Sequence, residues 1–197
     1  MIILFGLAGS GKGTQGKALS EVFGWKWLSV GEAIRQHGGY EEIINNGGLI
    51  PDEDVIRLMD KQIEKAEDEG FDVILDGYPR DKVQAEYIMD HMAAKVDGAI
   101  ILEVPKEELY QRLALRGRDD DKERASIDKR FEIFEQNIYS ILPLLEAKNI
   151  PIERVDGVGK IEEVTKRLIN VVKQMNPDAT EQENDVNGDD IERSYGE

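Results

Sequence analysis

Short runs of apolar residues alternate along this chain with longer segments in which apolar residues recur every three or four positions. Continuous apolar runs of this length are typical of buried parallel strands, and the longer segments are typical of amphipathic helices. Strand and helix in alternation predict an α/β fold, with a five-stranded parallel sheet between two layers of helices. The five runs are 1–5, 25–30, 71–75, 98–104 and 150–155.

Proline and glycine mark the ends of several predicted helices. One helix is expected from Pro51 to Gly70 and another from Pro105 to Gly117, because proline suits a first helical turn and glycine a helix end. A long amphipathic pattern follows from about residue 125 to residue 145. Pro143 lies inside it and is expected to kink or end the helix.

The loop after the first apolar run is rich in glycine, and residues 6–15 read GLAGSGKGTQ. Glycines let a backbone wrap around an anion, and the helix that follows adds the positive end of its dipole. The spacing G-x-x-x-x-G-K predicts a phosphate-binding loop in which Lys12 reaches the outer phosphates of a nucleotide. Since Gly13 follows the lysine, Thr14 has to supply the hydroxyl for magnesium. A flexible surface turn is the plain alternative, which the flanking strand and helix disfavour.

Charge and composition exclude several classes of protein. The chain has 25 basic and 41 acidic residues, a net charge of −16, so general affinity for nucleic acid or anionic membranes is not expected. No apolar stretch approaches the roughly 20 residues that cross a bilayer. The absence of cysteine excludes disulfides and cysteine-based zinc sites and fits a reducing, cytoplasmic location.

The last part of the chain differs in composition from the rest. Residues 177–197 contain eight acidic residues against one basic residue, Arg193, and almost no apolar ones. Such a segment cannot bury enough apolar surface to fold, so residues 176–197 are expected to be a disordered solubilising tail. An acidic peptide that docks a partner is the functional alternative. Residues 1–175 then form one domain.

Three polar or glycine-rich loops follow predicted strands, at residues 6–11, 76–80 and 157–159. Ligands of open α/β sheets bind beyond the carboxyl ends of the strands, so these loops should meet at one rim. The segment 31–51 contains two glycine pairs and Arg35 and is predicted to be a small helical insertion. Its place at this rim favours a flap that closes on substrate over an inert elaboration.

Arginines recur at strand ends and in one short stretch of this acidic chain. Surface arginines usually contribute little beyond solvation and weak ion pairs. Phosphoryl transfer, however, requires in-line positioning and positive charge around the moving group. The candidates for that role are Arg35, Arg80, Arg112, Arg116, Arg118, Arg124 and Arg130.

Residues 9–15 (GSGKGTQ) and 75–80 (LDGYPR) together resemble the adenylate kinases, within the nucleoside monophosphate kinases. The resemblance continues through 28–35, 48–53, 116–121 and 156–161, and so covers about residues 1–175. It implies a P-loop NTPase-type three-layer sandwich, with an insertion for the monophosphate at about 30–58 and a short lid at about 117–128. It also implies reversible, Mg²⁺-dependent phosphoryl transfer from ATP to AMP, giving two ADP, by a protein expected to be a monomer.

The resemblance also implies roles for individual residues. The implied ATP-binding residues are Gly9, Ser10, Gly11, Lys12, Gly13, Thr14, Arg112, Gly159 and Lys160. The implied AMP-binding residues are Ser29, Val30, Arg35, Gly77, Arg80 and Gln84. The implied catalytic residues are Lys12, Arg80, Arg116, Arg118 and Arg130. Magnesium would be held by Thr14 and, through water, by Asp76.

Some positions depart from the family pattern. Val30 stands where such adenylate kinases usually carry threonine, which removes a hydroxyl near the acceptor base. The stretch from Arg118 to Arg130 is one residue longer than the usual short lid, so Arg124 or Arg130 could take the last phosphate role; the helical residues 131–134 favour Arg130. The acidic residues 119–121 either orient the lid arginines or form a solvated turn.

The identity of the acceptor base depends on Gln84. Its amide can donate and accept, as the edge of adenine requires, although a solvent-facing helical glutamine is the plain alternative. Gln84 therefore favours AMP, whereas Val30 leaves open a UMP or CMP kinase of the same fold. A nucleotide-binding module without turnover is the alternative from another class.

Overall fold

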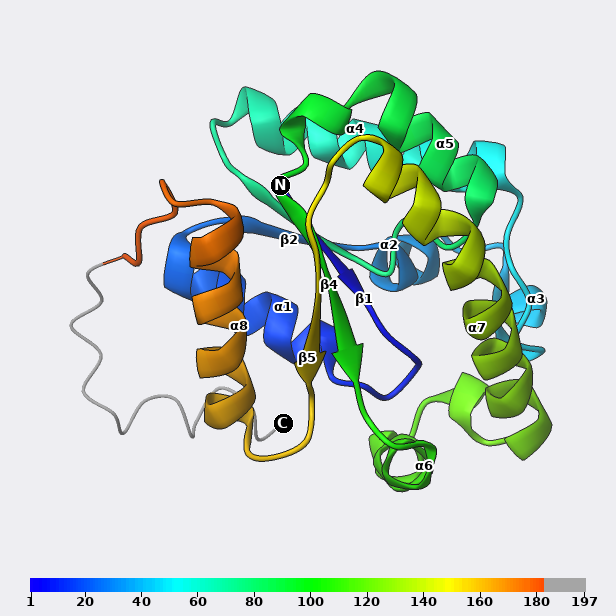
Figure 1. Ribbon diagram of the computed structural model, residues 1–197. Coiled ribbons are helices and arrows are strands. Elements are labelled where there is room, and N and C mark those ends of the chain that lie inside the picture. Colours follow the sequence, from blue (N-terminus) through cyan, green and yellow to red (C-terminus); the bar gives the residue numbers. More distant parts are fainter. Residues whose placement is uncertain (183–197) are drawn as a thin grey trace.

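The computed structural model describes residues 1–182 and contains a five-stranded parallel sheet in the order β2-β3-β1-β4-β5 (Figure 1). All four pairs of neighbouring strands are parallel, and each strand falls on one of the five apolar runs. The predicted α/β architecture is therefore confirmed. The strands are β1 (Ile2–Phe5), β2 (Lys26–Ser29), β3 (Val73–Asp76), β4 (Gly98–Glu103) and β5 (Ile152–Asp156).

Helices cover both faces of the sheet, as Figure 1 shows. Those of the main body and its insertions are α1 (Lys12–Phe23), α2 (Val30–His37), α3 (Glu41–Asn45), α4 (Asp52–Asp68), α5 (Lys82–His91), α6 (Lys106–Arg116), α7 (Arg124–Ala147) and α8 (Ile161–Met175). Two short 3₁₀ helices are η1 (Ala93–Lys95) and η2 (Asp119–Asp121). Helices α1 and α8 pack on one face, and α4, α5 and α7 pack on the other.

Strand β1 shows why the sheet carries a helical layer on each side. Successive side chains of a strand point to opposite faces. Ile3 and Phe5 join the apolar cluster with α4, α5 and α7, whereas Ile2 and Leu4 join the cluster with α1 and α8. Because both faces are covered, β1 reads as an uninterrupted apolar run rather than an alternating one.

Helix α7 excludes one of the two effects expected of Pro143, the end of the helix. It continues past Pro143 to Ala147 instead of ending there. Proline removes the hydrogen bond to the carbonyl of Tyr139, four residues earlier. Pro143 and the Tyr139 side chain are both exposed, so water can satisfy the freed carbonyl. The buried stripe that continues to Leu145 keeps the last turn in place.

The first residues of the predicted tail lie on the body of the protein. Asn176 donates its side-chain amide to Asp97 Oδ2 at 3.2 Å, and Ala179 packs against the cluster of α1 and α8. The backbone N–H of Gln182 donates to the carbonyl of Val22 at 2.8 Å, at the end of α1. The rest of the predicted tail, 183–197, lies outside the described residues.

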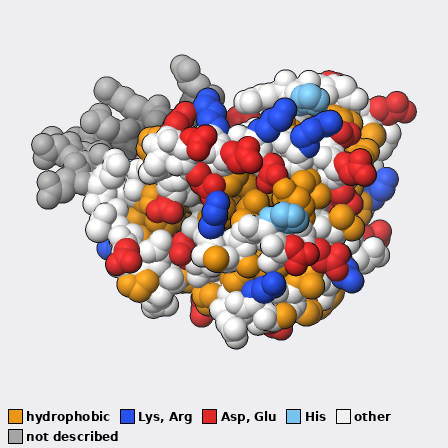
Figure 2. Space-filling model, turned by 90° about the horizontal axis from the view of Figure 1, so that it is seen from above, with side chains coloured by type: hydrophobic (Ala, Val, Ile, Leu, Met, Phe, Trp, Pro, Cys, Tyr) orange, Lys and Arg blue, Asp and Glu red, His pale blue; other side chains and the backbone are white. Residues whose placement is uncertain are grey.

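The composition also led to expectations about membrane-spanning segments and surface charge. In residues 1–182 no helix combines the length and the apolar character that crossing a membrane requires. On the face shown in Figure 2, basic side chains are scattered among acidic ones.

Replacing Gly16 by alanine is expected to destabilise the protein. The indole ring of Trp27 lies over this glycine of α1, and an added Cβ would stand 2.3 Å from its Cδ1 atom. We expect a net loss of about 1–2 kcal/mol, because the overpacking outweighs the better helix propensity of alanine. Thermal unfolding measures this loss. Gly13→Ala is the matched control, since its Cβ would meet Trp27 at an ordinary 3.6 Å and should not lower Tm.

Candidate active site

A cavity of about 960 Å³ opens where the strands of the sheet end. The loop between β1 and α1, the loop after β3, and helices α2, α6 and α7 contribute to its walls. Cavities of this size are typical of small-molecule sites. Its lining includes Lys12, Arg35, Arg80, Arg112, Arg116, Arg118 and Arg130. These cationic groups come from several separate segments of the chain and line one cavity.

The glycines of residues 6–11 adopt conformations that other residues rarely reach. Gly9 and Gly11 have φ angles of 85° and 97°, and Gly11 is the N-cap of α1. An added Cβ at Gly9 would lie 2.9 Å from Leu113 Cγ of α6. The loop is thus pressed between the sheet and α6, and the N-terminus of α1 faces the cavity, where it favours an anion.

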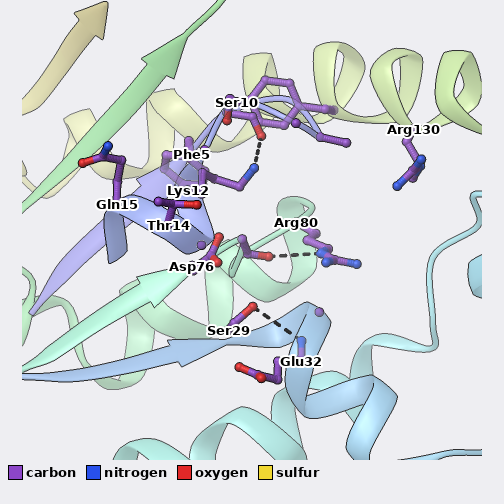
Figure 3. A pocket seen from close by; sticks show the side chains of 18 of the residues that line it. Phe5, Ser10, Lys12, Thr14, Gln15, Ser29, Glu32, Asp76, Arg80 and Arg130 are labelled. Carbon is purple, nitrogen blue, oxygen red and sulfur yellow. Dashed lines mark hydrogen bonds between the residues drawn. The ribbon is translucent and has the colours of Figure 1, made fainter. Parts of the chain in front are cut away.

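Among residues 1–182, no carboxylate forms an ion pair with Lys12. Its Nζ donates to the carbonyls of Gly6 at 2.6 Å and Leu7 at 3.0 Å, and Figure 3 shows the side chain directed back to its own loop. Burial lowers the pKa of Lys12 to about 8, against the opposing effect of Asp76. The positive charges of Arg80 and Arg116 contribute to this lowering of the Lys12 pKa. An anion in the cavity would relieve this excess of positive charge.

Oxygen ligands lie beside the first turn of α1. Asp76 ends β3 and is 7% exposed, and Figure 3 places Thr14 beside it. A Cβ on Gly13 would stand 3.7 Å from Asp76 Oδ2, so the carboxylate faces this turn. Carboxylate and hydroxyl oxygens suit the hard Mg²⁺ ion, which keeps several waters and binds few protein ligands. These two residues fit a magnesium site completed by water and phosphate.

Two guanidinium groups converge at the start of α2. An added Cβ at Gly31 would lie 3.4 Å from both Arg35 Nη1 and Arg80 Nη2, so this glycine leaves room for their approach. Arg80 Nε donates to the carbonyl of Gly77 at 3.1 Å. Burial lowers the pKa of Arg80, and Arg35 adds to that effect. Asn137 of α7 donates to the Arg80 carbonyl at 3.0 Å and holds this peptide in place.

The acidic residues of η2 orient arginines. Arg116 binds Asp121 through Nε and Nη2 at 2.6 and 2.8 Å, and Arg130 donates to Asp120 Oδ2 at 2.8 Å and to Asp121 Oδ1 at 2.7 Å. Burial opposes ionisation of Asp121, but Arg116 and Arg130 reverse this and lower its pKa. Asp120 and Asp121 are buried, so the solvated-turn alternative fits only Asp119, which is exposed and pairs with Lys122.

The structure separates the two candidates for the last phosphate contact. Arg124 lies over the ring of Tyr110, with its guanidinium carbon 3.3 Å from the ring centre, and pairs with Asp128 at 3.2 Å. It does not line the cavity, whereas Arg130 does. The geometry therefore supports Arg130.

Three residues expected at the site do not line the cavity, namely Val30, Gln84 and Lys160. Val30 is fully buried in the core, because as the first residue of α2 it faces the apolar cluster with α4 and α5. Lys160 is exposed, and its backbone N–H donates to Glu163 Oε2 at 3.1 Å. The remaining ATP-side and AMP-side residues predicted from the sequence are in the lining.

Gln84 is also buried, and its amide is occupied by protein partners. Nε2 donates to Asp52 Oδ1 at 2.9 Å and to Asp81 Oδ2 at 3.0 Å, while Oε1 accepts from the Arg80 N–H at 2.9 Å. In this conformation Gln84 supports the Arg80 loop. Contact with a base would require it to release these partners.

An apolar wall was not expected from the sequence. Helix α7 contributes Ile133, Phe134 and Ile138 to the cavity, and α2 contributes Ile34. Helical spacing of apolar residues marks a buried face but does not distinguish core from ligand wall. Gly47 also lines the cavity and packs against α7. An added Cβ on Gly47 would lie 2.6 Å from the carbonyl of Ser126.

Comparison with known proteins gives consistent matches. The family model described as "Adenylate kinase" matches residues 4–177. The adenylate kinase of Micrococcus luteus is 36% identical over 188 residues, covering 87% of this chain and 89% of that protein. The adenylate kinase of Porphyromonas gingivalis is 35% identical over 191 residues, covering 87% and 94%. That of Thermus thermophilus is 31% identical over 182 residues, covering 85% and 94%.

Proposed function

Because this chain belongs to the adenylate kinase family, we propose that it transfers the terminal phosphoryl group of ATP to AMP and so forms two ADP. One observation carries the proposal: Lys12, Arg80 and Arg130 come from three distant segments and line the same cavity. A module that binds only one nucleotide would not need a second cationic group, formed by Arg35 and Arg80, in addition to the phosphate loop.

The donor nucleotide occupies the side of the phosphate loop. Its phosphates accept hydrogen bonds from the N–H groups at the start of α1 and from Lys12, which leaves the carbonyls of Gly6 and Leu7. Arg112 bridges this loop and the β5–α8 loop, since it donates to the carbonyls of Ser10 and Gly157 at 3.5 and 3.0 Å. The donor base therefore lies between α6 and the β5–α8 loop.

The acceptor monophosphate lies between α2 and the loop after β3. Arg35 and Arg80 bind its phosphate, because their guanidinium groups converge over Gly31 and line the cavity. Guanidinium forks match phosphate oxygens in a bidentate way. The acceptor base then faces the insertion, where Leu49 and Ile50 add apolar surface.

Transfer needs no covalent intermediate on the protein. A phosphate oxygen of AMP attacks the terminal phosphorus of ATP in line, and the bond to the bridging oxygen breaks so that ADP leaves. Lys12, Arg116 and Arg130 stabilise the negative charge of the phosphoryl group as it passes between the nucleotides. Bound Mg²⁺ neutralises phosphate charge, and Thr14 and the waters held by Asp76 would keep it in place.

Closure of the cavity protects ATP from hydrolysis. We assign the insertion to residues 30–58 and the short lid to residues 117–128, which meet where Gly47 contacts the start of α7 at Ser126. Excluding water strengthens the electrostatic interactions and prevents transfer to water. A monomeric state and a cytoplasmic location stay predictions from the sequence.

A coupled assay tests the proposal directly. Purified protein with Mg-ATP is offered AMP, UMP, CMP and GMP in turn, and ADP formation is measured. We expect turnover with AMP. Turnover only with UMP or CMP would reassign the acceptor, and ATP binding without turnover on any acceptor would support the module without catalysis.

We expect kcat/KM for ATP to fall as the pH rises through about 8. The pKa of Lys12 is lowered to about 8 in the free protein, and the neutral amine no longer attracts phosphate. Bound phosphates favour the charged amine, so the decline in kcat should come at a higher pH than the decline in kcat/KM. Initial rates across this pH range, with Lys12→Met for comparison, check the assignment. If Lys12→Met showed the same decline in kcat/KM near pH 8, the titrating group would not be Lys12.

A further inference from the structure

The loop between β5 and α8 is braced from the side that faces away from the cavity. Arg167 of α8 donates through Nη1 to the carbonyl of Asp156 at 2.8 Å and to that of Val158 at 2.7 Å. Its side chain is 40% exposed and does not line the cavity. Arg167 therefore contacts the back of the loop whose front, at Gly157 and Gly159, lines the donor side.

Most backbone groups of this loop are occupied. The N–H of Gly157 donates to Glu103, and its carbonyl accepts from Arg112. The N–H of Val158 donates to Asp156 Oδ1 at 2.9 Å, and that of Lys160 donates to Glu163. Within residues 1–182, no hydrogen-bond partner is found for the N–H and C=O of Gly159. These two groups are available to a base.

Arg167 controls the direction of the Gly159 N–H. The carbonyl of Val158 and the N–H of Gly159 belong to the same planar trans peptide, so they point in opposite directions. When Arg167 holds the carbonyl at the back, the Gly159 N–H is directed the other way. Gly159 has a φ of 125° and lacks a Cβ, so without this bond little would prevent the peptide from rotating.

The far end of the loop is held independently. Gln15 is buried and donates through Nε2 to the carbonyl of Ile161 at 3.1 Å. The hydroxyl of Thr165 lies 2.8 Å from Gln15 Oε1. These contacts tie α8 to α1 directly behind the phosphate loop, and Figure 3 shows Gln15 directed away from Arg80 and Arg130. Loss of Arg167 would therefore free the Val158–Gly159 peptide and leave the loop's end in place.

We propose that Arg167 is a positioning residue that sets the donor-base specificity of this kinase by fixing the Val158–Gly159 peptide. Adenine presents an amino donor at position 6 where guanine presents an oxygen acceptor. When the Val158–Gly159 peptide is fixed, it presents the Gly159 N–H to the base. If this peptide were free to turn, it could present either the Gly159 N–H donor or the Val158 carbonyl acceptor. This inference rests on the proposed function, because it concerns the donor side of the same cavity.

The test compares donors in Arg167→Met, which keeps the apolar stem and removes the guanidinium. We expect the ratio of kcat/KM for ATP to that for GTP to fall about tenfold, with KM for AMP unchanged. Arg167→Lys retains a donor and should recover part of the ratio. Lys166→Met is the matched control, because it removes the same charge from the neighbouring exposed position and should leave the ratio unchanged.

Binding measurements keep the inference separate from the proposed function. Affinities for ATP, GTP and inorganic tripolyphosphate are measured by calorimetry on each variant. We expect the ATP-to-GTP affinity ratio to fall in Arg167→Met and tripolyphosphate binding to stay constant. A ratio within twofold of the parent, or equal weakening of all three ligands, would overturn the inference. If the parent protein forms no ADP from ATP and AMP, the proposed function fails, and the binding ratio still tests Arg167.

Discussion

Replacing Lys12 by methionine is expected to lower kcat about 10²- to 10⁴-fold. The ammonium group would make two or three charge-assisted hydrogen bonds to the phosphates, and each is worth roughly 1.5–3 kcal/mol. Part of that energy appears only as charge moves toward the transferred group, so kcat falls as well as affinity. Initial rates at saturating AMP, with ATP varied, measure both effects.

The fold should survive this change. Burial already disfavours the charge of Lys12 and lowers its pKa to about 8, so methionine removes an electrostatic cost. Tm of the variant should therefore equal or exceed that of the parent. Lys65→Met is the control, because Lys65 is an exposed lysine of α4 that does not line the cavity. A loss of activity in both variants, or a lower Tm in Lys12→Met, would contradict the assigned role.

The sheet could be predicted because its strands are covered on both faces. Burial on both sides leaves no polar alternation, so each strand is a short apolar run between helical segments. The same rule explains the site, since the carboxyl ends of parallel strands share one edge. Asp76 ends β3, Lys12 and Gly157 come after β1 and β5, and all three line the cavity.

The sequence was less informative about the direction of individual side chains. Val30 lies next to Ser29, which lines the cavity, yet Val30 points into the core. That direction depends on the register of α2 against α4, which a local pattern does not contain. Gln84 is similar, because its partners Asp52 and Arg80 come from other segments of the chain. Amide chemistry identified a residue able to bind a base, but packing decides what the amide contacts.

The acidic residues 119–121 illustrate the limit of composition. Three consecutive aspartates look alike in the sequence, but only Asp120 and Asp121 turn inward. The arginines that hold them come from the two helices flanking η2, Arg116 from α6 and Arg130 from α7. These carboxylates fix the directions of Arg116 and Arg130, which would lower the cost of ordering the two side chains around a phosphate.

Replacing Arg80 by methionine is expected to raise KM for AMP at least about 100-fold while changing ATP affinity less than about threefold. Two hydrogen bonds from a guanidinium to a phosphate together contribute roughly 3–6 kcal/mol. The effect should fall on the acceptor, because the Arg80 guanidinium lies beside that of Arg35 at the start of α2. Kinetics with each nucleotide varied, and calorimetry with ATP, separate the two sites.

Arg57→Met is the control for this selective effect on AMP. Arg57 lies on α4 near the acceptor side, but it is exposed, pairs with Asp54 at 2.6 Å and does not line the cavity. Its loss removes the same charge and should leave both nucleotide constants unchanged, because exposed pairs contribute little. If Arg80→Met weakened ATP and AMP equally, Arg80 would act on the whole cavity and not on the acceptor phosphate. The selective loss therefore tests whether the two cationic groups bind two different nucleotides, on which direct transfer between them depends.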